Sequence, residues 1–463
     1  MQRWKMTAGL MGLSALAVFI APRLSAVLAP PPAAPPAAPP VVSPPPPAQP
    51  STPTGHLSVD VRLDQSAALA DRASERFITI DVIADAAPGT QARRPVDLTV
   101  VLDTSGSMNE GKLDQAKRAT RHLAEQMGPN DTFSVVTFAD RARVIQPAGP
   151  ADPATLGRVL DRVWDYGGTN LYEGISVGAD QIVGRPEAIH RVVVLSDGHP
   201  TTGRKTDDSF HRLAGQLAQR GVSVSTVGLG LDFNEDLLAS MADLGGGSYD
   251  FVSEAVDLTT VFDDELSRTA SVIARDTRVA LTLPEGIDGL EIIGWTATRS
   301  AGGWSVYLGD VAAGSRTRIV AKVQVSPQAA GARTIDATAT YSDLIDARRA
   351  SDADTETLTI TSDEVVVRRS VDPNAAAVAR RAYGNWYLDM STRSYADGDQ
   401  RAEALLEQGR ALLLDAVAHD PAAEADLAEL ESTRSVFESV APSHPRARQR
   451  VKANKERYRA VFR

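Results

Sequence analysis

The stretch that decides the fold is VDLTVVLDTSGS, residues 96–107. Its first part is a mostly apolar run, interrupted by Asp97 and Thr99, that leads directly into Asp103. An apolar run of this length followed by a polar, glycine-containing loop is typical of a buried strand in a parallel sheet. Open α/β sheets bind ligands outside the carboxyl ends of their strands, so this loop is a candidate binding site.

The residues after this loop alternate between helical and strand patterns. Apolar residues recur at helical spacing over residues 113–127, and short apolar runs follow at 133–138, 192–195 and 222–229. Further helices are predicted at residues 154–164, 171–183, 210–217, 237–241 and 258–273. Buried strands that alternate with helices predict an α/β domain over residues 95–273, with a doubly wound, mostly parallel sheet of the Rossmann-like type.

The flanking regions alternate with a period of two, which is typical of half-buried antiparallel strands. Such runs occur at residues 57–63, 77–83, 279–283, 304–308, 319–325, 334–341 and 355–361. A hairpin alone is only marginally stable. We therefore expect residues 55–94 and 274–362 to form one β-sandwich into which the α/β domain is inserted.

Residues 363–463 are predicted to be helical. Eight Lys and Arg residues against one Glu lie between Arg446 and Arg463. Such a run is usually a solvated face, and contact with anionic lipid or an acidic partner is the alternative.

The N-terminus has the pattern of a targeting segment. Arg3 and Lys5 precede an apolar run over residues 8–21, so residues 1–29 are predicted to be a signal peptide or a membrane anchor. Residues 30–54 are rich in proline and favour an extended polyproline II spacer, and a disordered leader without a role is the alternative. We expect an exported protein that is periplasmic or extracellular, with the N-terminal segment either cleaved or kept in the cytoplasmic membrane.

Composition removes several classes of function. The chain has 463 residues, a formal charge of -11 and no cysteine. Disulfides, thiolate metal sites and a cysteine nucleophile are excluded, and the acidic balance argues against nucleic-acid binding. The phosphate-loop and H-E-x-x-H motifs do not occur. We assign no catalytic residue and no organic cofactor, and we interpret His199 as a loop residue rather than a base.

Three polar segments lie in loops that are expected at the same edge of the predicted sheet, two of them directly after strands and one just before the helix that starts at Leu171. Asp103, Ser105 and Ser107 form a D-x-S-x-S string, and Thr169 and Asp197 lie in two later loops. Carboxylate and hydroxyl oxygens are hard ligands that suit Mg²⁺. The first string alone is a weak signal, because Ser and Asp are also common helix caps. The three segments together predict a metal site.

These segments resemble the metal-ion-dependent adhesion site of the von Willebrand factor type A family. The D-x-S-x-S motif of that family falls on Asp103, Ser105 and Ser107, its threonine on Thr169 and its second aspartate on Asp197. The resemblance covers about residues 95–273. The flanking sandwich and the N-terminal segment resemble bacterial calcium-activated chloride channel-like proteins, although one short apolar segment gives no basis for a pore.

The resemblance implies a divalent metal ion, with Mg²⁺ expected first and Mn²⁺ or Ca²⁺ as alternatives. It also implies that one coordination position stays open for an Asp or Glu of a protein partner. The function expected is therefore metal-dependent protein–protein interaction or adhesion, not catalysis. An envelope scaffold with a structural metal and a metal-dependent hydrolase are the alternatives.

We predict that residues 55–463 lie outside the cytoplasmic membrane, because a charged and then apolar N-terminus directs export. A phosphatase reporter that matures only after export, fused after Arg463, should be active. High activity of a reporter that works only in the cytoplasm, fused at the same position, would contradict this topology.

Overall fold

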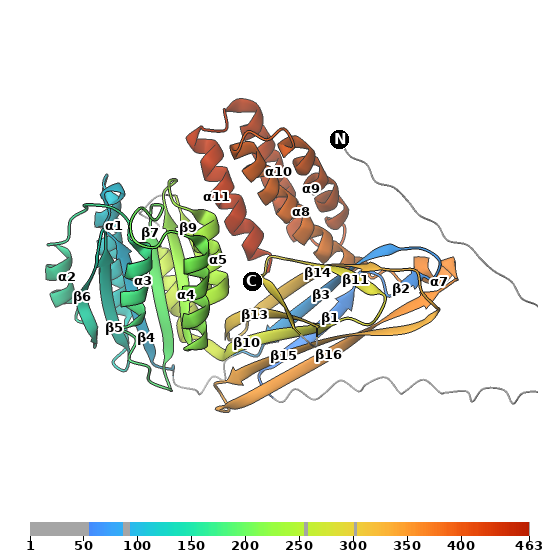
Figure 1. Ribbon diagram of the computed structural model, residues 1–463, viewed down its shortest axis with the longest axis horizontal. Coiled ribbons are helices and arrows are strands. Elements are labelled where there is room, and N and C mark those ends of the chain that lie inside the picture. Colours follow the sequence, from blue (N-terminus) through green and yellow to red (C-terminus); the bar gives the residue numbers. More distant parts are fainter. Residues whose placement is uncertain (1–54, 87–92, 254–257, 301–302, 463) are drawn as a thin grey trace, which may run out of the picture. The chain divides into compact units, whose positions relative to one another are not determined.

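The computed structural model describes residues 55–86, 93–253, 258–300 and 303–462. The predicted targeting segment and the proline-rich spacer lie outside these residues. The described chain contains one mixed α/β sheet, two antiparallel sheets and a set of C-terminal helices, which confirms the predicted fold class (Figure 1). No helix in these described ranges combines the length and the apolarity needed to cross a bilayer.

The α/β sheet has the strand order β6-β5-β4-β7-β8-β9. Its strands are β4 (Val96–Asp103), β5 (Thr132–Phe138), β6 (Ala142–Gly149), β7 (Ile189–Ser196), β8 (Val222–Leu229) and β9 (Gly246–Val252). All neighbours pair in parallel except β5 and β6, which are antiparallel. Every residue of β4, β7 and β8 is buried, as expected for central strands covered on both faces.

Helices cover both faces of this sheet (Figure 1). One face packs against α1 (Lys112–Gln126), α2 (Pro153–Leu160) and α6 (Leu258–Ala270), and the other against α3 (Leu171–Ala179), α4 (Asp207–Gln219) and α5 (Glu235–Gly245). The apolar spacing predicted for α1 is confirmed, because Leu113, Ala116 and Leu123 are all buried against the sheet.

Some predicted bounds were wrong at the edges of the domain. The helix expected to reach residue 164 ends at Leu160, and the helix expected to reach residue 273 ends at Ala270, because β10 begins at Val272. The edge strands β6 and β9 were not predicted. Gly246 adopts φ 69° as the cap of α5 and also begins β9.

Two sheets form the β-sandwich, and both are antiparallel except for one short parallel pair at an edge, between β2 and β16. Their orders are β1-β3-β14-β11 and β12-β13-β10-β15-β16-β2. Their strands are β1 (Leu57–Leu63), β2 (Ala67–Leu69), β3 (Ser74–Ala84), β10 (Val272–Thr282), β11 (Ile287–Ile293), β12 (Ala297–Ser300), β13 (Gly303–Ala312), β14 (Arg316–Val325), β15 (Gly331–Asp343) and β16 (Arg348–Thr361). Strand β3 pairs along β14, so the N-terminal strands do complete the sandwich around the inserted domain.

Four of the five C-terminal helices pack against one another, and two of these four also form ion pairs with the α/β domain. The five helices of the described chain are α7 (Glu364–Arg369), α8 (Pro373–Ala396), α9 (Ala402–Ala416), α10 (Ala422–Ser439) and α11 (Pro445–Ala460). Lys452 on α11 is only 3% exposed. Its ammonium donates to a Glu235 carboxylate oxygen at 2.7 Å and to the Phe233 carbonyl at 2.9 Å.

The remaining buried cations of α11 show the same pattern. Lys455 pairs with Asp236 and Arg459 with Asp243, both on α5. The prediction that this basic run is mainly a solvated face was therefore wrong. Its acidic partner is a helix of the same chain, which the composition of the run by itself could not reveal.

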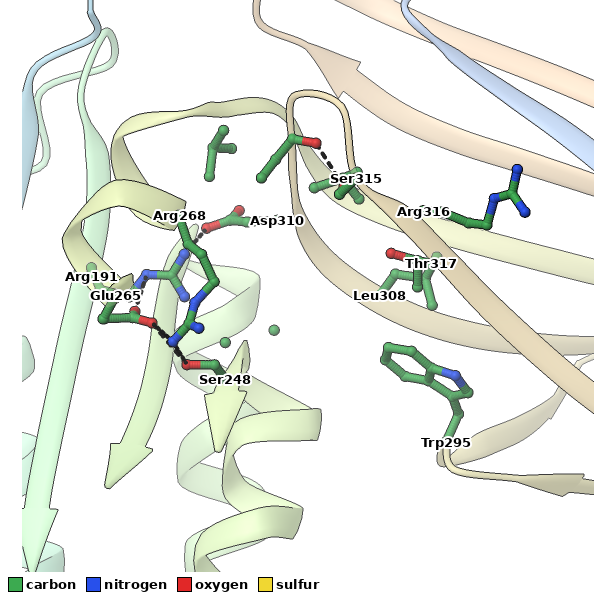
Figure 2. A pocket seen from close by; sticks show the side chains of 15 residues that line it. Arg191, Ser248, Glu265, Arg268, Trp295, Leu308, Asp310, Ser315, Arg316 and Thr317 are labelled. Carbon is green, nitrogen blue, oxygen red and sulfur yellow. Dashed lines mark hydrogen bonds and ion pairs between the residues drawn. The ribbon is translucent and has the colours of Figure 1, made fainter. Parts of the chain in front are cut away.

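The α/β domain also forms ion pairs with the sandwich, at a different place from its contact with α11 (Figure 2). Arg191 of β7 lies between Glu265 of α6 and Asp310 of β13, with Arg191 Nη2 3.1 Å from Asp310 Oδ2 and Nε 3.5 Å from Glu265 Oε1. These three residues line a cavity of about 130 Å³ together with Arg268 and Trp295. The cations and carboxylates there pair with one another, so we interpret the cavity as part of a structural junction.

We predict that Arg459→Met destabilises the chain. The change removes a nearly buried guanidinium from the Asp243 carboxylate, and breaking a buried pair from one side costs about 3–5 kcal/mol. The exposed Arg446 on the same helix provides the control, because Arg446→Met should change the free energy of unfolding by less than about 0.5 kcal/mol. Chemical denaturation would measure the free energy of unfolding of both variants. Equal values for the two variants would contradict a stabilising α11–α5 contact.

Candidate metal site

The first segment of the site is the loop that follows β4. Asp103 is completely buried, and its Oδ1 accepts a hydrogen bond from the Ser105 backbone N–H at 2.8 Å. The Thr104 side chain turns away and donates to the Phe138 carbonyl at the end of β5. This alternation directs residues 103, 105 and 107 to one side, and the Ser105 and Ser107 hydroxyl oxygens lie 3.0 Å apart.

The second aspartate comes from the neighbouring strand. Because β4 and β7 are parallel with Leu102 opposite Leu195, the residues that follow both strands meet at the same edge. Asp197 is also completely buried, and its Oδ1 accepts a hydrogen bond from the exposed Ser107 hydroxyl at 2.7 Å. The structure thus joins the first and third predicted segments directly.

Thr169 is held between the ends of β5 and β7. Its backbone N–H donates to the Thr201 hydroxyl at 2.7 Å, and its carbonyl accepts from the Thr201 N–H at 3.0 Å. A Cβ placed on Gly198 would lie 3.4 Å from the Ser107 hydroxyl oxygen and 3.6 Å from that of Thr169. Both hydroxyls therefore border one small space next to Asp197, and all five predicted residues lie around it.

The Thr169 hydroxyl makes no hydrogen bond within the described part of the chain, so its oxygen remains available to a ligand. The set of donors around the space consists of two carboxylates and three hydroxyls. Hard oxygen donors of this kind fit Mg²⁺ or a related divalent ion, and water can complete its coordination.

Burial of the two carboxylates makes their negative charges unfavourable in the metal-free site. Burial raises the pKa of Asp103 to about 6, although hydrogen bonds from Ser105 and Ser196 lower it, and the nearby Asp197 raises it further. Two buried like charges repel each other in a low-dielectric environment. A cation at this edge of the sheet would relieve both the burial and the repulsion.

Two contributors to the site were not predicted. Ser196, the last residue of β7, donates its hydroxyl to Asp103 Oδ2 at 2.6 Å and so orients that carboxylate. Lys112, the first residue of α1, places its ammonium 2.6 Å from Asp197 Oδ2. A lysine in the first turn of a helix opposes the helix dipole, and this was the signal in the sequence that a nearby anion compensates it.

The comparisons place the inserted domain in a class. Residues 97–264 match the family model of the von Willebrand factor type A domain. This part of the chain is therefore similar to the von Willebrand factor type A domain, whose family typically mediates metal-dependent protein interactions. The match covers the strands and loops that supply all five site residues.

Several known proteins are similar in sequence to part of this chain. The uncharacterized Synechocystis protein sll0103 is 27% identical over 232 residues, which are 48% of this chain and 54% of that protein. Escherichia coli YfbK is 24% identical over 190 residues, covering 40% and 33%. Mouse inter-alpha-trypsin inhibitor heavy chain H2 is 25% identical over 164 residues, covering 33% and 17%. The matches thus span about half or less of the length of these relatives.

Solved structures share the fold over most of the chain. A von Willebrand factor type A protein from Catenulispora acidiphila superposes with a TM-score of 0.68 at 16% identity, covering 87% of this chain and 97% of that one. The ArnB paralog VWA2 from Sulfolobus acidocaldarius has a TM-score of 0.55 at 18% identity, covering 87% and 99%. These likenesses concern the fold alone.

Proposed function

We propose that this protein binds a divalent ion, Mg²⁺ first, through Asp103, Ser105, Ser107, Thr169 and Asp197, and through that ion binds an acidic side chain of a protein partner. The observation that carries the proposal is the convergence of two fully buried carboxylates and three hydroxyls on one open space. The ion would supply the positive charge that the buried carboxylates lack and an electrophilic position for a carboxylate ligand.

The rim of the site supports an interaction role. Trp164 is 65% exposed, which is the highest value among the large apolar side chains of the described residues. It lies on the loop that leads to Thr169, where the Tyr166 N–H donates to the Thr104 carbonyl and the Trp164 and Tyr166 rings are 6.4 Å apart. Exposed tryptophans are frequent anchors of protein interfaces. We assign Trp164 to the partner-binding surface.

We place the folded part of this protein in the periplasm or outside the cell, carried there by the N-terminal segment as signal peptide or anchor. The relation to calcium-activated chloride channel-like proteins stays a prediction from the flanking sequence. We propose no enzymatic activity. His199 is exposed beside the site, where no hydrogen bond to Asp197 orients it within the described residues.

Asp103→Asn should abolish binding of Mg²⁺ and Mn²⁺ at millimolar concentration, because one of the two anionic donors is lost. Thr169→Val should weaken binding less, because water can replace one neutral oxygen. Isothermal titration calorimetry of the metal-free variants would measure this. The exposed Asp208 provides a matched control, since Asp208→Asn removes the same charge at a distance from the site. Equal heats from wild type and Asp103→Asn would contradict the site.

The stability of the metal-free protein should depend on pH, and Asp103→Asn should remove this dependence. The folded-state pKa of Asp103, about 6, lies above its ordinary value of 3.8, so ionising this residue destabilises the metal-free fold. As pH rises from about 4 to 7, metal-free wild type should lose on the order of 1–3 kcal/mol relative to Asp103→Asn. Denaturation in EDTA across this range would measure the difference, and parallel curves for the two proteins would contradict it.

We expect the partner to need both the ion and Trp164. A protein captured from the cell envelope on tagged wild type in Mg²⁺ should be released by EDTA and should not bind Asp103→Asn. Trp164→Ala should bind the ion as wild type does but retain less partner, because only the rim is altered. Retention of the same protein in EDTA would instead favour a scaffold with a structural metal.

A further inference from the structure

The site already contains a positive charge from the protein itself. Lys112 Nζ donates to Asp197 Oδ2 at 2.6 Å and to the Ser107 carbonyl at 3.1 Å. Both of these residues belong to the proposed ligand set. The second oxygen of Asp197 accepts from the Ser107 hydroxyl, so the ammonium takes the side of the carboxylate that the hydroxyl does not.

The chain adopts an unfavourable local structure to place this ammonium. Glu110 and Gly111 both have positive φ, 56° and 83°, immediately before α1 begins at Lys112. A non-glycine residue in this region is strained. A cation at a helix N-terminus is also unfavourable, because the backbone N–H groups there carry partial positive charge. The ion pair with the fully buried Asp197 offsets both costs.

The Lys112 side chain is nevertheless not locked in the protein interior. It is 25% exposed, so solvent reaches it. The ammonium is therefore a cation at the rim of the site, tethered by a flexible four-carbon side chain that can carry it from Asp197 toward solvent.

We propose that Lys112 is a built-in competitor of the divalent ion for Asp197. In the metal-free protein it neutralises part of the charge of the two buried aspartates and keeps the loops in their binding geometry. An incoming divalent ion has to displace the ammonium from Asp197, so Lys112 lowers the affinity of the site and sets the ion concentration at which it fills. This inference rests on the proposed metal site.

The test compares ion binding by wild type, Lys112→Met, Lys112→Arg and the control Lys117→Met. Lys117 lies on the same helix and pairs with Asp114, so its removal makes the same change in net charge away from the site. Calorimetry with Mn²⁺ should give Lys112→Met at least about tenfold tighter binding than wild type, because a nearby like charge is removed. Lys112→Arg and Lys117→Met should stay within about threefold of wild type.

A second measurement uses wild type alone. In the metal-free protein, the ammonium held by Asp197 should react slowly with an amine-acylating reagent. Saturating Mn²⁺ should increase acylation of Lys112 and leave that of Lys117 unchanged, as measured by mass spectrometry of the peptides.

Equal Mn²⁺ affinities of wild type and Lys112→Met would overturn the competition and leave the metal site standing. Unchanged Lys112 acylation at saturating ion would do the same. Mn²⁺ binding by Lys112→Met with no detectable binding by wild type would also support the competition, because Lys112 would then keep the ion out altogether. Absence of binding by every variant would overturn the metal site itself, so the two failures are distinguishable.

Discussion

Two buried carboxylates on adjacent parallel strands are the constraint on which the site depends. Asp103 follows β4 and Asp197 follows β7, and the register of these strands brings both to one edge with no solvent exposure. Burial and mutual repulsion disfavour two charges there. The surrounding groups respond to this, since Ser105, Ser107 and Ser196 donate hydrogen bonds and Lys112 supplies a charge.

Strand β7 also links the site to the rest of the chain. It carries Arg191 in its first half, where the guanidinium pairs with Asp310 of the sandwich, and it leads into Asp197 at its other end. On the far side of the sheet, α5 is held by the buried cations of α11. The inserted α/β domain is thus joined to the sandwich and to the C-terminal helices by ion pairs, in addition to its two chain connections.

Strand patterns were enough to predict the centre of the domain, whereas features that depend on tertiary partners were missed. Strands β4, β7 and β8 are apolar and buried on both faces, so they could be placed together with the loops after β4 and β7, which hold four of the candidate ligands. Thr169 was placed by the helical pattern that follows it, now α3. Strands β6 and β9 lie at the sheet edges, where β6 has no fully buried residue and β9 begins among glycines, so their patterns were weak. Lys452 looks like an ordinary surface lysine until the acidic group opposite it is known, and the position of Lys112 at a helix start does not reveal which anion it contacts.

Charge explains why an acidic partner suits such a site. The two aspartates and Lys112 together carry one net negative charge, which makes the metal-free site tolerable in the protein interior. On the proposed function, a divalent ion converts this to one net positive charge with the ammonium still tethered nearby. One further carboxylate restores neutrality, and the exposed Ser107 lies on the open side from which it can enter. Because the other three proposed ligands are neutral hydroxyls and not carboxylates, the proposed site would leave this last charge to be supplied by another protein.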